Sequence, residues 1–182
     1  MRGNAKPKAM NKEIRFSAPW SPGVKIITFA VTAILVGVSL ASSVHLGDST
    51  PLFARVVATF LPLAILVATL PFIIRGYVLN DHELRVERLG WENRFALANV
   101  ESVGANPDGM RWSFRLCGSG GLFGYFGWFR NRALGTYRAY GTAPKNSVVL
   151  KLKDRTIVLT PQDPARFVEE VLCRLKPEPA RR

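Results

Sequence analysis

Two apolar stretches decide the fold: IITFAVTAILVGVSLASSV at residues 26–44 and VVATFLPLAILVATLPFII at residues 56–74, both without a charged side chain. As α-helices with a rise of about 1.5 Å per residue, each would be about 28 Å long, close to the ~30 Å hydrocarbon core of a bilayer. Cations flank the stretches at Lys25, Arg55 and Arg75, where their side chains can reach lipid headgroups. We therefore predict an N-terminal transmembrane helical hairpin over residues 24–75, with helices at about 24–44 and 55–75.

Two other interpretations of these stretches are open. The two stretches could form a buried hairpin of a soluble protein, but two adjacent uncharged runs of this length favour a bilayer. The first stretch could also be a cleaved signal peptide, with small residues at 41–43 as the cleavage site. Residues 1–23 are long for the basic region of a signal peptide, and the apolar run exceeds the usual length of about 7–15 residues.

The distribution of basic residues predicts the orientation of the hairpin. The chain has a net charge of +12, and residues 1–23 carry Arg2, Lys6, Lys8, Lys12 and Arg15 against Glu13. More arginines follow the second stretch, whereas the connector at 45–53 contains Asp48 and no Lys or Arg. Cytoplasmic loops are enriched in Lys and Arg, so we expect residues 1–23 to be a basic cytoplasmic leader and both termini to be cytoplasmic. This pattern suits anionic lipid headgroups, and we expect no nucleic acid partner.

Small residues recur every four positions in both predicted helices, at Ala33, Gly37 and Ala41 and at Ala64 and Ala68. Such spacing lets helix backbones approach closely in lipid. Alanine and glycine are also simply common in membrane helices, so a packing role for these residues stays one of two interpretations.

Residues 76–176 have the pattern of a separate domain that is rich in strands. Alternating apolar and polar residues predict strands at 84–89, 94–103, 110–116 and 135–142, and a hairpin over 147–160. Asp163 and Pro164 then begin an amphipathic helix, which Pro177 ends. The predicted class is α+β, with a disordered tail at 177–182.

Several motifs resemble a known family. They are GSGGLFGYFG at 118–127, YRAYGT at 137–142 and TPQDPARF at 160–167, together with YVL at 77–79 and LRV at 84–86. The chain resembles the bacterial pleckstrin-homology-like (PH-like) family of small two-span membrane proteins. The resemblance implies seven strands in two sheets, as a small β-barrel or sandwich capped by the C-terminal helix, in the bacterial inner membrane. It implies no enzymatic activity, and phosphoinositide binding does not carry over because no corresponding loop motif is present.

The segment CGSGGLFGYFGWFRNR at 117–132 is the most unusual part of the domain. Glycine recurs at every third position from 118 to 127, which indicates a pliable or unusual backbone. The candidate contact residues between and after the glycines are Phe123, Tyr125, Phe126, Trp128, Phe129, Arg130 and Arg132. They could meet lipid headgroups, form a protein contact or fill the core of the domain itself.

Catalytic, cofactor and metal motifs are not found. Ser119 lacks the glycine two residues before it that a nucleophile elbow requires, and the glycine segment does not match a dinucleotide-binding pattern. Cys117 and Cys173 do not have metal-ligand spacing, and His45 and His82 are expected on opposite sides of the membrane. We therefore predict a non-enzymatic protein without a cofactor.

The sequence thus predicts a membrane-anchored binding or adaptor module. Its PH-like domain would be held at the inner leaflet, where it contacts lipid headgroups, a protein partner or a second copy of the chain. The alternative is an accessory subunit of a membrane transport or envelope complex, whose spans contact other membrane proteins. An enzyme acting on lipids is less well supported, since no catalytic set of residues is present.

Overall fold

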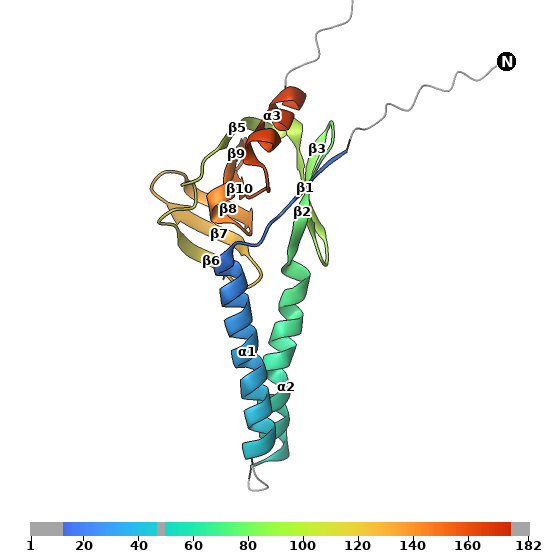
Figure 1. Ribbon diagram of the computed structural model, residues 1–182, viewed down its shortest axis with the longest axis vertical. Coiled ribbons are helices and arrows are strands. Elements are labelled where there is room, and N and C mark those ends of the chain that lie inside the picture. Colours follow the sequence, from blue (N-terminus) through green and yellow to red (C-terminus); the bar gives the residue numbers. More distant parts are fainter. Residues whose placement is uncertain (1–12, 47–49, 176–182) are drawn as a thin grey trace, which may run out of the picture.

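The computed structural model describes residues 13–46 and 50–175 (Figure 1). Two long helices, α1 (Pro22–His45) and α2 (Leu52–Thr69), lie side by side as a stalk, and the strands and the last helix form a domain at one end of it. The predicted α+β class is confirmed. The predicted tail at 177–182 and most of the predicted leader lie outside the described residues.

Both stalk helices are long and apolar enough to cross a membrane, and most of their side chains are exposed. Ser21 caps α1 by accepting a hydrogen bond on Oγ from the backbone N–H of Val24 at 3.3 Å. The second helix ends earlier than predicted: it passes into a 3₁₀ turn, η1 (Leu70–Phe72), which contains Pro71, and Ile74 already belongs to a strand.

The small residues predicted to pack the spans are exposed, namely Ala33, Gly37, Ala41, Ala64 and Ala68. A Cβ atom added at Gly37 would meet no atom within 4 Å. Ser39 is instead the buried residue in the middle of α1, so the two helices of one chain meet along another face. Packing of the small residues against a second chain stays a prediction.

The first sheet is antiparallel in the order β1-β2-β3-β4. Its strands are β1 (Ile14–Ser17), β2 (Ile74–Leu79), β3 (Glu83–Arg88) and β4 (Glu92–Ala96). β1 precedes α1 and falls in the predicted leader, yet it pairs with β2, with Phe16 opposite Tyr77. The chain on either side of the helical hairpin therefore returns to the same sheet.

The second sheet has the order β5-β9-β10-β8-β7-β6, in which only β8 and β10 are parallel among the described strands. Its strands are β5 (Val100–Ala105), β6 (Phe114–Gly120), β7 (Tyr125–Asn131), β8 (Gly135–Gly141), β9 (Val148–Leu152) and β10 (Thr156–Leu159). Short 3₁₀ turns, η2 (Leu97–Asn99) and η3 (Pro144–Asn146), lie between strands, and α3 (Pro164–Leu175) ends the described chain.

Several predicted elements differ from the structure. The extended segment predicted at 94–103 is divided by η2 into β4 and the start of β5. The strand predicted at 110–116 begins only at Phe114, because a turn occupies the preceding residues and Trp112 has a positive φ of 53°. The described residues form ten strands rather than the seven that the family resemblance implied.

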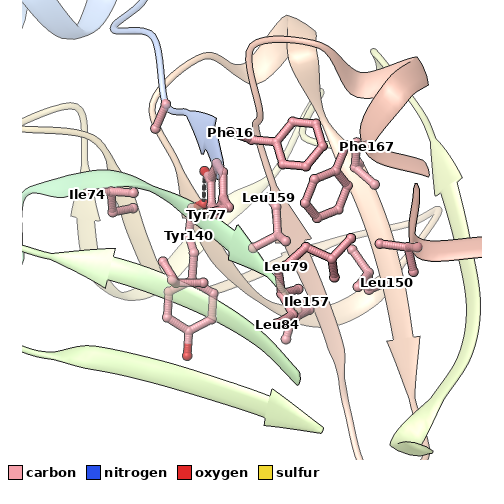
Figure 2. Close-up of a cluster of buried hydrophobic side chains, with 14 of the residues drawn as sticks. Phe16, Ile74, Tyr77, Leu79, Leu84, Tyr140, Leu150, Ile157, Leu159 and Phe167 are labelled. Carbon is pink, nitrogen blue, oxygen red and sulfur yellow. Dashed lines mark hydrogen bonds between the residues drawn. The ribbon is translucent and has the colours of Figure 1, made fainter. Parts of the chain in front are cut away.

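One hydrophobic core fills the space between the two sheets and α3 (Figure 2). At its centre, the hydroxyl of the fully buried Tyr77 donates a hydrogen bond to the backbone carbonyl of Tyr140 at 2.7 Å and accepts one from the N–H of Thr160 at 3.1 Å. Burial raises the pKa of Tyr77 to about 12. Phe167 joins α3 to this core by an edge-on contact with Phe16, at 5.0 Å between ring centroids.

Candidate functional site

The tip of the β6–β7 hairpin lies against the first turns of α1. The backbone N–H of Phe123 donates a hydrogen bond to Thr28 Oγ1 at 3.0 Å, and Thr28 Oγ1 lies 3.4 Å from the carbonyl of Gly121. A Cβ at Gly121 would come within 2.7 Å of Ile27 Cδ1. The unusual segment at 117–132 thus packs where the apolar helix leaves the domain.

The glycines of this segment are required by its backbone. Gly118, Gly121, Gly124 and Gly127 have φ values of +112°, +142°, +138° and +119°, a region that other residues rarely adopt. Gly118 and Gly127 are cross-strand partners, and a Cβ on either would lie 2.1 Å from a backbone oxygen of the opposite strand. The segment therefore forms an unusually shaped but defined hairpin.

The structure separates the predicted aromatic residues. Phe129 is buried in a second cluster, where its ring stacks on Tyr137 at 6.0 Å. Phe123 is buried against α1, whereas Tyr125 and Phe126 are half-buried and Trp128 is 37% exposed. Packing within the protein thus accounts for some of these rings, and contact with lipid or a partner stays a prediction for the others.

Arg130 and Arg132 lie at the opposite end of the hairpin from its tip. Both are exposed and line an open cavity of about 930 Å³ together with Arg111, Trp112 and Phe114. Trp112 is 83% exposed and Phe114 is 79% exposed. The structure therefore does not bring the two predicted arginines together with the aromatic residues near α1.

Four aromatic rings surround Arg88 at the other helix junction. The Arg88 Cζ atom lies 5.1 Å from the ring centroid of Tyr140, 5.4 Å from Trp91, 5.6 Å from Phe126 and 6.0 Å from Phe72. We call these four rings the aromatic cage. Phe72, which ends η1, stacks on Phe126 at 5.2 Å, and Arg88 is only 8% exposed. The cage therefore lies where α2 enters the domain.

A second arginine, Arg138, lies on the same inner face of the second sheet as Tyr140. Its Cζ is 5.4 Å from the Tyr140 ring centroid and 5.7 Å from that of Trp128, its cross-strand partner. Burial is the main cause that lowers the pKa of Arg88; Tyr140 acts in the opposite direction, and the positive charge of Arg138 lowers the pKa further. Two guanidinium groups therefore share one tyrosine ring.

Neither arginine has an acidic partner among the described residues. The Nε atoms of Arg88 and Arg138 are buried, with no hydrogen bond partner in the part of the chain that the structure describes. Asn93 Oδ1 is also buried without a hydrogen bond partner among the described residues. Asn93 lies opposite Val86 in the strand register, so its side chain is on the inner face of the first sheet.

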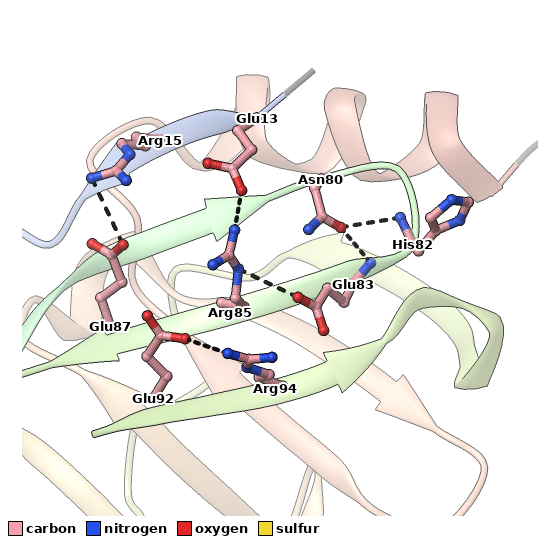
Figure 3. Close-up of polar contacts among 9 residues, drawn as sticks. All are labelled: Glu13, Arg15, Asn80, His82, Glu83, Arg85, Glu87, Glu92 and Arg94. Carbon is pink, nitrogen blue, oxygen red and sulfur yellow. Dashed lines mark hydrogen bonds and ion pairs between the residues drawn. The ribbon is translucent and has the colours of Figure 1, made fainter. Parts of the chain in front are cut away.

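The outer face of the first sheet has the opposite arrangement (Figure 3). There, every arginine drawn lies beside a carboxylate: Arg15 with Glu87 at 3.7 Å, Arg94 with Glu92 at 3.3 Å, and Arg85 with both Glu13 and Glu83. Strand alternation turns these side chains outward and Arg88 inward, because Leu84, Val86 and Arg88 are the buried residues of β3. Among the described residues, Arg88 on the inner face of the same sheet has no carboxylate beside it.

The sequence alone does not mark Arg88 and Arg138 as a pair. A signal was present within each strand, because ELRVER places Arg88 in register with two buried apolar residues, and YRAY places Arg138 beside Tyr140. The meeting of the two arginines depends on how the sheets pack, which local patterns do not predict.

Among the described residues, no group of three His, Cys, Asp or Glu could hold a metal ion. Comparison with known families gave one finding: a model described as a bacterial PH domain matches residues 75–175. Neither a curated protein nor a solved structure gave a significant match.

Proposed function

The chain belongs to the bacterial PH domain family, and we propose from this premise that it is a non-enzymatic binding module anchored in a membrane. Domains of this type generally bind lipids or proteins and are not catalysts. The two sheets share one core with α3, which supports a PH-like sandwich capped by that helix.

The observation that carries the proposal is the attachment of both apolar helices to one end of the domain. The hairpin tip contacts Thr28 of α1, and the turn after β3 contacts η1, which directly follows α2: the N–H of Gly90 donates a hydrogen bond to the carbonyl of Pro71 at 3.2 Å. If the helices span a bilayer, these contacts hold the domain directly at the headgroups, because α1 and α2 would enter the lipid at this depth.

The pairing of β1 with β2 supports a hairpin topology. β1 precedes α1 and β2 follows α2, so the two strands can form one sheet only when they lie on the same side of the membrane. The basic flanks of the helices favour the cytoplasmic side. We therefore propose a multi-pass protein of the bacterial inner membrane, with both termini in the cytoplasm and lipid headgroups or a protein as the ligand.

One observation favours the accessory-subunit alternative. The small residues of both helices, represented by Gly37 and Ala64, face outward and are free to contact helices of another membrane protein. Cross-linking followed by mass spectrometry separates the two functions: contacts at the helices support the subunit, and contacts at residues 117–132 support the binding module.

Labelling of cysteines tests anchoring and orientation together. The native Cys117 and Cys173 are exposed and serve as internal markers, and Thr50→Cys places a thiol in the connector. A membrane-impermeant maleimide should label position 50 in cells with a permeabilised outer membrane, and the native cysteines only after the inner membrane is opened. Labelling of Cys117 before position 50, or release of the chain from membranes by carbonate, would contradict the proposal.

A further inference from the structure

An open cavity lies at the end of the β6–β7 hairpin that is away from α1. Its volume is about 930 Å³, and Trp112, Phe114, Arg130 and Arg132 are among the residues that line it. We propose that this cavity binds an extended acidic segment of another protein, which pairs with the free edge of β6. This inference rests on the proposed function and specifies the class of partner. Because β6 has seven residues, the cavity lies roughly 20 Å from the contact between the hairpin tip and α1.

The arginines of the cavity carry a positive charge that the described residues do not balance. The Asp108 carboxylate, which also lines the cavity, lies 3.8 Å from Arg111. Arg130 and Arg132 are exposed and have no carboxylate beside them in the described part of the chain. Arginine pairs with carboxylates by charge-assisted hydrogen bonds, so the cavity is complementary to Asp and Glu side chains.

Two aromatic rings of the cavity are left in solvent. Trp112 is 83% exposed and Phe114 is 79% exposed. Trp112 also has a positive φ of 53°, a backbone conformation that costs free energy for a residue with a side chain. Aromatic rings beside arginine are typical of the residues that contribute most to protein–protein binding. These rings therefore indicate a partner with apolar side chains between its acidic ones.

Hydrogen bonds hold the cavity in a defined shape. The side-chain amide of the buried Asn131 donates to the Gly109 carbonyl at 2.9 Å and to Ser113 Oγ at 3.0 Å. Its oxygen accepts a hydrogen bond from the N–H of Leu134 at 2.8 Å, and the Tyr137 hydroxyl donates to Ser113 Oγ at 2.7 Å. The turn before β6 is thus tied to the turn after β7. A preformed site of this kind loses less conformational entropy on binding.

The free edge of β6 offers backbone contacts to an extended segment. Among the described strands, β6 pairs only with β7 and is the last strand of its sheet, whereas β5, at the other edge, has α3 beside it. A strand edge with unpaired N–H and C=O groups accepts a further strand from another chain. Phe114 and Leu116 are exposed on β6, so an added strand would also cover apolar surface.

The charges of the chain favour another protein over other occupants. A second copy that paired through the same edge would bring Arg115, Arg130 and Arg132 close to their own counterparts. Residues 1–12 carry basic and no acidic side chains, and residues 176–182 carry more basic than acidic ones, so neither end of the chain is complementary to the cavity. Anionic lipids match the arginines, but a lipid surface has no backbone that could pair with the edge of β6.

The test is a peptide selection with the full chain in a non-ionic detergent. The probe is a phage-displayed library of random ten-residue peptides. The baits are the wild type, the cavity variant Arg130→Gln/Arg132→Gln and the matched control Arg15→Gln/Arg94→Gln. The control removes two exposed arginines from the outer face of the first sheet.

We expect the wild type and the matched control to select peptides enriched in Asp and Glu together with apolar residues. The cavity variant should select no acidic peptides. Fluorescence anisotropy of the selected peptides should show binding that is about tenfold weaker or more in the cavity variant, and about fivefold weaker in Trp112→Ser. All substituted side chains are exposed, so the variants should keep the fold, which circular dichroism checks.

Each outcome decides the proposal. Acidic peptides that bind the wild type and lose affinity in the cavity variant support it. A selection without enrichment of Asp and Glu, or equal binding by the wild type and the cavity variant, overturns it. Arginine-dependent binding of phosphatidylglycerol in mixed micelles without any acidic peptide, or a dimer that the cavity substitutions dissociate, overturns it in favour of lipid or a second copy. Because the selection is done in detergent, failure of this site is distinguishable from failure of the membrane anchor.

Discussion

The Tyr77 hydroxyl donates a hydrogen bond to the Tyr140 carbonyl at 2.7 Å, and this bond joins the strand that leaves α2 to the strand that carries Arg138. The same hydroxyl accepts a hydrogen bond from the N–H of Thr160. This phenol group therefore links the first sheet to β8 and to the residue that follows β10, at the centre of the core that the two sheets share.

Replacement of this hydroxyl should destabilise the domain. Tyr77→Phe leaves the buried carbonyl of Tyr140 and the N–H of Thr160 without their partner, which we expect to cost about 1–3 kcal/mol. Urea unfolding of the full chain in detergent measures the loss. Tyr137→Phe removes a half-buried bond to Ser113 instead and should cost less. Equal losses for the two variants would contradict a special role of Tyr77.

Alkaline pH should weaken the fold through the same residue. The pKa of Tyr77 is raised to about 12 by burial, whereas an unfolded tyrosine has a pKa of about 10. Between these values the unfolded state releases a proton that the folded state keeps, so stability is complete below pH ~10 and falls as the pH rises toward 12, by up to about 3 kcal/mol. Urea unfolding at pH 9, 10 and 11 should show this loss, and Tyr77→Phe should show a smaller one.

The glycine pair of the β6–β7 hairpin should not tolerate a side chain. Gly118→Ala and Gly127→Ala each combine a positive φ with a contact of 2.1 Å to backbone oxygen, so we expect a loss of roughly 3 kcal/mol or more, or an unfolded hairpin. Gly104→Ala is the matched control, because nothing lies within 4 Å of its added Cβ. A Gly118→Ala protein as stable as Gly104→Ala would show that the hairpin has another shape.

Sequence patterns predict the helices and strands that are determined by their own residues. The alternation of apolar and polar residues at 148–159 predicts the last β-hairpin, and the apolar stripe of α3 predicts the last helix. The two uncharged runs predict α1 and α2. β1 was missed because its four residues become a strand only by pairing with β2, about sixty residues further along the chain. The sequence predicts a strand at Trp112 because Trp112 and Phe114 are alternate apolar residues, but the positive φ of Trp112 places it in a turn.

The candidate site could be predicted only in part, for the same reason. The glycine spacing indicated an unusual backbone at 117–132, and the structure shows which backbone requires it. Arg88 and Arg138 lie about fifty residues apart on different sheets, and they share Tyr140 only after the sheets have packed. Such a pairing has no signature in either strand alone.

The contact of the hairpin tip with α1 should be separable from the fold of the domain. Thr28→Val keeps the shape of the side chain but removes the acceptor of the Phe123 N–H, which we expect to cost about 1–3 kcal/mol. Hydrogen exchange of residues 120–124 should then accelerate, while exchange in β9 and β10 should stay unchanged. Thr32→Val, one turn further along α1, is the control, and faster exchange in that variant would assign the effect to the helix.

Two neighbouring aromatic residues should have different roles, and this would resolve the interpretations that the sequence left open. Phe129 is buried against Tyr137, so Phe129→Ser should destabilise the domain by about 3–5 kcal/mol. Trp128 is 37% exposed and covers Arg138, so Trp128→Ser should cost about 1 kcal/mol and leave the domain folded. Urea unfolding of both variants measures the two losses. If Trp128→Ser unfolds the domain as Phe129→Ser does, Trp128 is a core residue and its exposed face has no role in binding.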